Sequence, residues 1–221
     1  MNRLEWILGI ILVILLVAVA GLAMLLWRQP QQTAPAGTHP EVAVYVNDVA
    51  PIPNTVGQTA KMAYVVAQEI IKEWQPDAIL LSTTATWPQG AKSDHIKQGT
   101  SDWAFTFHSP STSSNATVTV VNGQTTLIPG NSNDQLQLLD SSSWRVDSPD
   151  AVGKVLSEGG KTFIDKEGIT ILSMTLVTND PYKNGRLEWL ASVIATQTGN
   201  AYTMRIDAAS GDVIEIQDTS S

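Results

Sequence analysis

The chain of 221 residues contains no cysteine. This absence excludes disulfide bonds, thiolate metal ligands, cysteine nucleophiles and a lipoprotein anchor, in which a cysteine carries the lipid. Histidine is also scarce, because the 3 histidines of the chain are His39, His95 and His108. Thiol chemistry is therefore absent, and imidazole chemistry is limited to these three residues.

The chemistry-bearing residues that remain do not form a recognisable motif. The nearest set to a metal site is Asp94, His95, Asp102 and His108, which lacks the tight spacing of metal ligands on one element. Serine is plentiful, but no Gly-x-Ser-x-Gly elbow is present, and no histidine stands in a nucleophile motif. We interpret the carboxylate pairs Asp165/Glu167 and Asp212/Glu215 as exposed. The sequence therefore predicts no catalytic residue, no metal, no cofactor and no enzyme activity.

Positive charge is in short supply as well. The chain has 13 Lys and Arg residues against 21 Asp and Glu residues, a formal net charge of −8. The acidic residues are scattered, as on an ordinary solvated surface. An acidic protein repels nucleic acid, so nucleic acid is excluded as a partner.

The longest apolar segment runs from Trp6 to Trp27 and contains no charged residue. As a helix it would be ~33 Å long, against a bilayer hydrocarbon core of ~30 Å. Trp6 and Trp27, with Arg28 beyond, would then lie at the membrane–water interfaces, where indole rings are enriched. The segment predicts a single-pass transmembrane helix, and thus a lipid bilayer contacted through residues 6–27.

A cleaved signal peptide is the alternative, because Ala18-Val19-Ala20 could precede a cleavage site. The apolar run continues past that site through Trp27, which is longer than a normal secretory core. The short tail 1–5 favours a cytoplasmic N-terminus. The predicted location is the plasma membrane, with the C-terminal part extracytoplasmic.

Composition divides the rest of the chain into four segments. Residues 28–53 contain Pro30, Pro35, Pro40, Pro51 and Pro53, which favours an extended stalk. Residues 54–128 and 148–218 are two α+β units, joined by a polar linker at 129–147. The predicted fold class is α+β, with a transmembrane helix followed by two units, each a helix packed on its own antiparallel sheet.

The two units share an order of elements. The first opens with a capping pattern at Thr55 and Gln58, an apolar helical stripe from Ala63 to Trp74, and strands at 78–87, 102–108, 116–121 and 124–128, the last two joined by Asn122-Gly123. The second opens with Ser148 as helix cap, ends its helix at Gly159-Gly160, and continues with strands at 168–178, 187–196, 201–207 and 212–216.

The end of the second unit resembles a known family. Residues 201–214 read AYTMRIDAASGDVI, in which an apolar strand ends in Asp-Ala, two variable residues, Gly, an acid and two apolar residues. This pattern is similar to the closing strand–turn–strand of PepSY domains, and residues 148–216 resemble them loosely. We interpret residues 55–128 as a degenerate second copy. Asp207 can accept hydrogen bonds from turn amides, and Gly211 can supply a positive φ. The resemblance implies a cystatin-like fold and a binding or peptidase-modulating role without catalytic residues.

Tryptophans supply the candidate contact residues. Trp74, Trp103 and Trp189 fall on the expected inward faces, whereas Trp87 and Trp144 fall in loops, where an exposed indole is typical of an interface. We therefore expect a non-catalytic membrane-anchored protein whose tandem PepSY-like modules bind or modulate a partner protein. The alternative is an accessory structural subunit of a larger membrane complex, with integral membrane subunits as partners.

Overall fold

The computed structural model describes residues 57–100, 102–131, 138–179 and 185–220. The described residues all belong to the second of the two units of the chain, Val42–Ser221. The predicted transmembrane helix 6–27, the interface residues Trp6, Trp27 and Arg28, and the stalk 28–53 lie outside the described residues.

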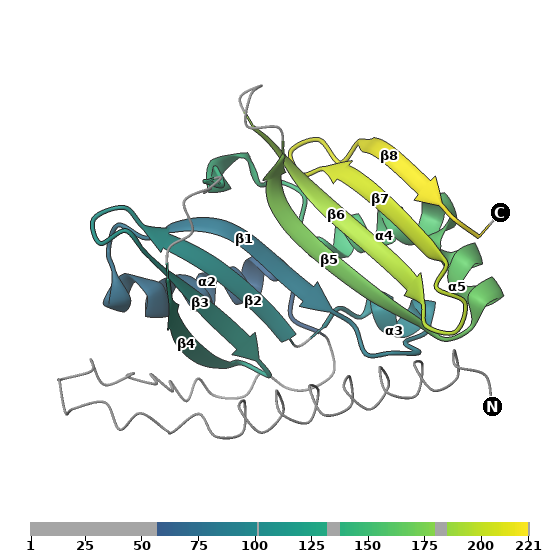
Figure 1. Cartoon of the computed structure of the whole chain (residues 1–221), viewed down its shortest axis with the longest axis horizontal. Helices are drawn as coiled ribbons and strands as arrows, with labels where there is room; N and C mark the ends of the chain where they lie inside the picture. Colours follow the sequence, from purple (N-terminus) through teal and green to yellow (C-terminus); the bar gives the residue numbers. More distant parts are fainter. Residues whose placement is uncertain (1–56, 101, 132–137, 180–184, 221) are drawn as a thin grey trace, which may run out of the picture. The chain divides into compact units, whose positions relative to one another are not determined.

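The second unit is built on one antiparallel sheet of eight strands, drawn in Figure 1. Their order across the sheet is β4-β3-β2-β1-β5-β6-β7-β8. The first four are β1 (Ile79–Thr86), β2 (Asp102–Ser109), β3 (Ser114–Val121) and β4 (Gln124–Gly130). The last four are β5 (Thr170–Asn179), β6 (Arg186–Ala195), β7 (Ala201–Asp207) and β8 (Val213–Asp218). Each group is therefore a meander, and the two meanders meet at β1 and β5.

This single sheet overturns the predicted fold class. The sequence predicts two units, each with its own sheet, but β1 pairs directly with β5, with Thr84 opposite Thr175. In two separate sheets, both β1 and β5 would be edge strands with unpaired backbone groups. Their pairing satisfies those groups and joins the two repeats into one sheet.

The predicted single-pass membrane character and plasma-membrane location are also corrected. In the part of the chain that the structure describes, no helix combines the length and apolarity needed to cross a bilayer.

The helices lie behind the sheet in the view of Figure 1. They are α2 (Ala60–Trp74), α3 (Ser93–Lys97), α4 (Ser148–Val155) and α5 (Lys161–Glu167), with short helical turns at Ser141–Ser143 and Leu156–Gly160. In α2 the predicted stripe faces the sheet, and Ala63, Ala67 and Ile70 are buried. One face of the sheet thus carries the core, and the opposite face carries none of the described helices.

The N-terminal ends of α2 and α4 meet, and the capping residues differ from those predicted. Thr59 caps α2 in place of Thr55, and Asp147 caps α4 in place of Ser148. The Asp147 carboxylate accepts hydrogen bonds from the Ser148 amide at 2.7 Å and from the Lys61 amide at 3.1 Å. The Ser148 hydroxyl therefore accepts a hydrogen bond from the Ala60 amide instead, at 2.9 Å. The two repeats therefore share their helix caps, which the sequence of either repeat alone could not indicate.

The predicted helix end at Gly159-Gly160 is a kink. Gly159 has a φ of +124°, a conformation that L side chains rarely adopt, and the chain then continues into α5. A Cβ on Gly159 would lie 3.3 Å from the Tyr202 ring, so the kink also lets the helix approach β7 closely.

A row of aromatic rings crosses the core between the two meanders. Trp103 of β2 contacts Trp189 of β6 edge-on, with ring centroids 6.3 Å apart. The row continues with Trp87, whose centroid is 6.4 Å from that of Trp103, and with Trp144, 5.9 Å from Trp189. The Trp144 and Trp189 indoles both donate to the Val146 carbonyl, at 2.8 Å and 2.9 Å. The two repeats thus share one hydrophobic core.

Candidate interaction surface

The face of the sheet opposite the helices, here called the open face, is dominated by short hydroxyl side chains. Cross-strand pairing defines one row across all the strands: Thr126, Thr119, Ala104, Thr84, Thr175, Leu190, Arg205 and Glu215. Neighbouring rows add Ser82, Thr86, Thr106, Thr117, Ser173, Ser192 and Thr203, all half-buried or exposed. Threonine suits a half-exposed strand, so this composition stabilises the sheet whether or not a partner binds.

The open face carries exposed apolar side chains on both meanders, with Val121 and Ile128 on the outer strands of the first. Leu190 and Ile194 of β6 are 43% and 44% exposed, and Ile194 lies directly opposite Ile171 of β5. We call these three residues the β6 patch. Strand β6 is apolar on both sides, because its other face carries the buried Leu187, Trp189, Ala191 and Val193. This two-sided apolar pattern is the sequence signal that could have revealed the β6 patch, which was not among the predicted contact residues.

A charged cluster borders the β6 patch. The Glu188 side chain is 3% exposed although it lies on the open face. Its carboxylate accepts hydrogen bonds from Arg186 Nε at 2.8 Å, Arg205 Nε at 2.9 Å and Asn179 Nδ2 at 3.0 Å. Arg205 also donates to Glu215 at 2.8 Å. The charges are therefore balanced within the cluster.

The protonation of Glu188 reflects two opposing effects. Burial by itself raises the pKa of the Glu188 carboxyl, but the hydrogen bonds from Asn179, Arg186 and Arg205 outweigh burial. The pKa therefore lies below its usual value, and the carboxyl is ionised at neutral pH. A carboxylate whose two oxygens both accept hydrogen bonds in this way has a structural role, joining neighbouring strands, and is not a general acid or base.

The turn between β7 and β8 has the geometry that the sequence indicates. Asp207 accepts hydrogen bonds from the Ala209 and Ser210 amides at 2.8 Å and 3.0 Å. Gly211 has a φ of +82°. Both residues shape the turn, and neither is arranged for catalysis.

The two candidate contact tryptophans lie in the core. Trp87 is 2% exposed and donates its indole N–H to the Gly99 carbonyl at 3.1 Å, and Trp144 is 5% exposed. A buried indole is not available to a partner, so we propose no contact through either residue.

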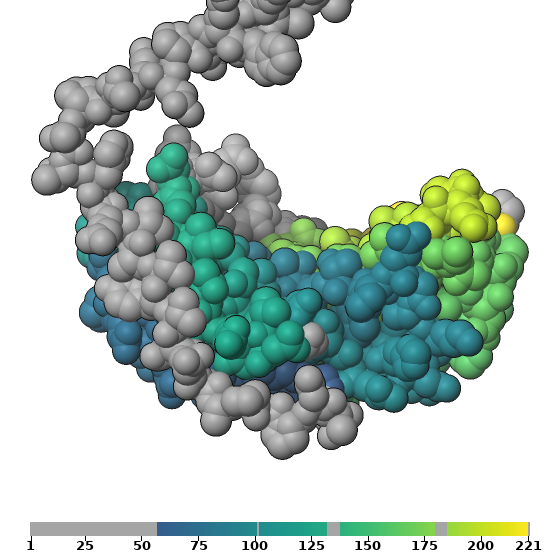
Figure 2. Space-filling view, turned by 90° about the horizontal axis from the view of Figure 1, so that it is seen from below, coloured from purple at the N-terminus to yellow at the C-terminus, as the bar shows by residue number. Residues whose placement is uncertain are grey.

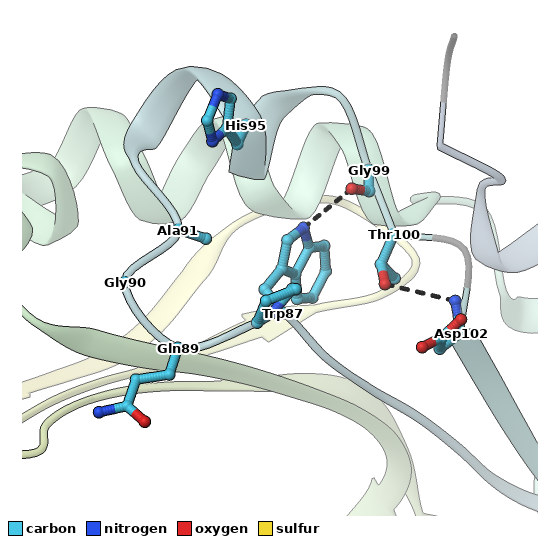
Figure 3. A pocket seen from close by; sticks show the side chains of 9 residues that line it. Trp87, Gln89, Gly90, Ala91, His95, Gly99, Thr100 and Asp102 are labelled. Atoms are coloured by element: carbon cyan, nitrogen blue, oxygen red, sulfur yellow. Dashed lines mark hydrogen bonds between the residues drawn. The ribbon is translucent and has the colours of Figure 1, made fainter. Parts of the chain in front are cut away.

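A cleft of about 370 Å³ lies where the chain passes from β1 through α3 into β2. Its lining includes Trp87, His95, Thr100 and Asp102. Figure 3 shows His95 and Asp102 on opposite sides of Trp87, so they do not converge on one point. Within the described residues, no group of three or more His, Asp or Glu side chains is arranged to hold a metal ion.

Of the other two predicted metal candidates, Asp94 lies on α3 beside His95 and His108 lies on β2, outside the lining of the cleft. His108 is buried at 9% exposure, and its Nδ1 atom lies 2.8 Å from the Asn115 side-chain oxygen. The structure therefore does not bring the four candidate residues together, and the open face is the better candidate site.

Comparison with known proteins adds little. No protein-family model and no curated protein matches the chain. Among solved structures, the crystal structure of a candidate lipoprotein from Clostridium difficile 630 is similar at 14% identity and a TM-score of 0.36, over 71% of this chain and 92% of that chain. A likeness at this level carries no argument about the fold or the function.

Proposed function

We propose that this protein is a non-catalytic binding protein that holds a partner protein against the open face of its sheet. The observation that carries the proposal is the exposed β6 patch, on the sheet face that no described helix covers. An antiparallel sheet commonly exposes one polar face to water. Ile171 pairs with Ile194, and Leu190 lies four residues before Ile194 on the same face of β6. These residues depart from that pattern, because they place apolar surface where a purely solvated face needs none.

Size and charge support this face as an interface. Eight strands spaced ~4.8 Å apart and about 20 Å long give roughly 770 Å², close to the ~800 Å² that each partner buries in a standard interface. Strands β1 and β2 carry mainly Ser, Thr and Ala there, and the Glu188 cluster is internally neutral. A partner can therefore cover the face without burying an unpaired charge, which would be costly.

The chemistry of the described residues supports a non-catalytic role. The best-buried carboxylate, Glu188, is fully occupied by donors, and the cleft beside Trp87 lacks a nucleophile–base pair within hydrogen-bond reach. The resemblance of residues 201–214 to PepSY domains favours binding as well.

Photocrosslinking of the full-length protein in its own cells tests the proposal. A photoreactive amino acid at Thr175, beside the β6 patch, should give one discrete adduct with another protein. The same amino acid at Glu69, exposed on α2, should not give it. Equal adducts from both positions, or no adduct from Thr175, would contradict the proposal.

A matched pair of variants tests the β6 patch itself. Leu190→Thr with Ile194→Thr removes the apolar contact while keeping strand-compatible residues. Met62→Thr with Val65→Thr removes similar apolar surface from α2, where these residues are 50% and 58% exposed. Only the first pair should abolish the adduct, and loss with the second pair alone would place the interface on the helices.

A further inference from the structure

Strand β8 lies at one edge of the sheet, and β4 lies at the other. Figure 2 shows the yellow residues of β7 and β8 at one margin of the described surface and the teal residues of β3 and β4 towards the other. The two edges differ in sequence. Strand β4 includes Pro129, which has no backbone N–H, whereas β8 contains no proline. Only β8 has the full set of backbone donors along its edge.

The register shows which backbone groups of β8 point outward. The Thr219 amide donates to the Ala201 carbonyl at 2.9 Å, and Gln217 and Glu215 lie opposite Thr203 and Arg205 in the same alternation. In an antiparallel pair, hydrogen-bonded residues alternate with residues whose N–H and C=O groups face away. The N–H and C=O groups of Ile216 and Asp218 therefore face away from β7, and no described strand pairs with them.

The side chains of this edge are apolar and acidic. Ile216 is 42% exposed, although its neighbour Met204 in β7 is buried. The segment from Asp212 to Asp218 has no lysine or arginine, and it carries Asp212 and Asp218 besides Glu215, whose charge Arg205 already balances. An acidic edge repels a second acidic strand, and a chain of net charge −8 is therefore poorly suited to pair with another copy here.

We propose that the outer edge of β8 binds an extended, lysine- or arginine-containing segment of a partner protein as a ninth strand. The outward backbone groups of Ile216 and Asp218 supply main-chain hydrogen bonds, Ile216 supplies the apolar contact, and the acidic residues select a basic segment. This site is distinct from the β6 patch, so an experiment can refute one of the two proposed binding sites and leave the other standing.

Two synthetic fluorescent peptides, TKVKVKVT and TEVEVEVT, test the proposal by anisotropy with the full-length protein. The basic peptide should bind and should weaken as salt increases, and the acidic peptide should not bind. Equal binding of both peptides, or binding of neither, would overturn the proposal. A concentration-dependent dimer in light scattering that excludes the basic peptide would show that a second copy occupies the edge, which also overturns it.

Two matched variants at position 216 distinguish the contribution of the backbone N–H to peptide binding from that of the side chain. Ile216→Pro and Ile216→Thr both replace the branched isoleucine side chain with a smaller one, but only proline removes the outward N–H. Binding of the basic peptide should be about tenfold weaker for Ile216→Pro than for Ile216→Thr. Equal affinity of the two variants refutes strand addition, provided that far-UV circular dichroism shows both are folded.

The β6-patch variant Leu190→Thr with Ile194→Thr completes the design. It should bind the basic peptide as the unchanged protein does. Loss of peptide binding in this variant would place the peptide on the open face and refute the β8 site.

Discussion

The contact between Trp103 and Trp189 gives a direct test of whether the two repeats fold as one unit. Trp103 belongs to the first meander and Trp189 to the second, and their rings meet edge-on with centroids 6.3 Å apart. Both residues are buried, at 1% and 0% exposure. We expect the variants Trp103→Leu and Trp189→Leu to have coupled effects on the free energy of unfolding.

The expected loss of unfolding free energy follows from the interactions that each indole ring makes. Trp103 donates to the Gln58 carbonyl and Trp189 to the Val146 carbonyl, each at 2.9 Å, and each hydrogen bond contributes about 1 kcal/mol. Lost packing volume adds about 2 kcal/mol, so each single variant should lose about 3 kcal/mol. The ring pair itself contributes about 1 kcal/mol and can be lost only once. The double variant should therefore lose about 5 kcal/mol, less than the sum of the two single losses.

Urea denaturation followed by far-UV circular dichroism measures these values without relying on tryptophan fluorescence. The pair Trp103→Leu and Phe163→Leu serves as the control. Phe163 contacts the Tyr202 ring instead, and this pair should be additive within about 0.5 kcal/mol. Additivity of the Trp103 and Trp189 variants, or two separate unfolding transitions, would refute the shared core.

Three further variants test individual features of the fold. Glu188→Gln should lower the unfolding free energy by about 2 kcal/mol at pH 7. The pKa of Glu188 in the folded protein lies below its ordinary value of 4.5. The stability that the ionised carboxylate contributes is therefore present above pH 4.5 and is lost as the pH falls through the folded-state pKa. Urea titrations of the unchanged protein and of Glu188→Gln should thus give converging unfolding free energies in acid. Asp147→Ala should cost about 1–2 kcal/mol by calorimetry, against about 0.5 kcal/mol for Asp150→Ala, which removes only an acid from the first turn of α4; equal costs would contradict the shared cap. Gly211→Ala should lower the unfolding free energy by about 1–2 kcal/mol, because Gly211 has a φ of +82°. Gly153→Ala, where the added Cβ meets open space on α4, should instead raise it by about 0.5 kcal/mol. Shifts of the melting temperature in the same direction for both variants would contradict the assigned turn.

Local patterns were sufficient to locate the strands. The alternation of Tyr202, Met204 and Ile206 with polar residues predicts β7 at the bounds that the structure has. The turn at Asn122-Gly123 is similarly local, since both residues adopt positive φ, at 51° and 79°. These features depend on neighbours within a few residues, so the order of residues specifies them.

The candidate site was much harder to predict. Trp87 and Trp144 follow strand and turn residues, and a loop context suggests exposure. In the structure Trp103 of the same repeat packs against Trp87, Trp189 of the second repeat packs against Trp144, and both indoles are buried. Leu190 and Ile194 were read only as part of a strand, because the sequence does not say which side of a two-sided apolar strand the helices cover. The metal candidates His95 and His108 lie apart for the same reason, since their separation depends on how α3 and β2 pack.

Hydrophobic periodicity and turn residues act over short distances, so the order of residues specifies a repeated succession of one helical segment and four strands. The pairing of β1 with β5, the capping of α4 by an Asp147 that also binds the start of α2, and the contact of Trp103 with Trp189 depend on long-range packing. Each of these contacts joins residues that are distant in the chain. Such pairs form because an isolated meander would leave strand edges, helix ends and apolar faces unsatisfied, and the other repeat satisfies all three.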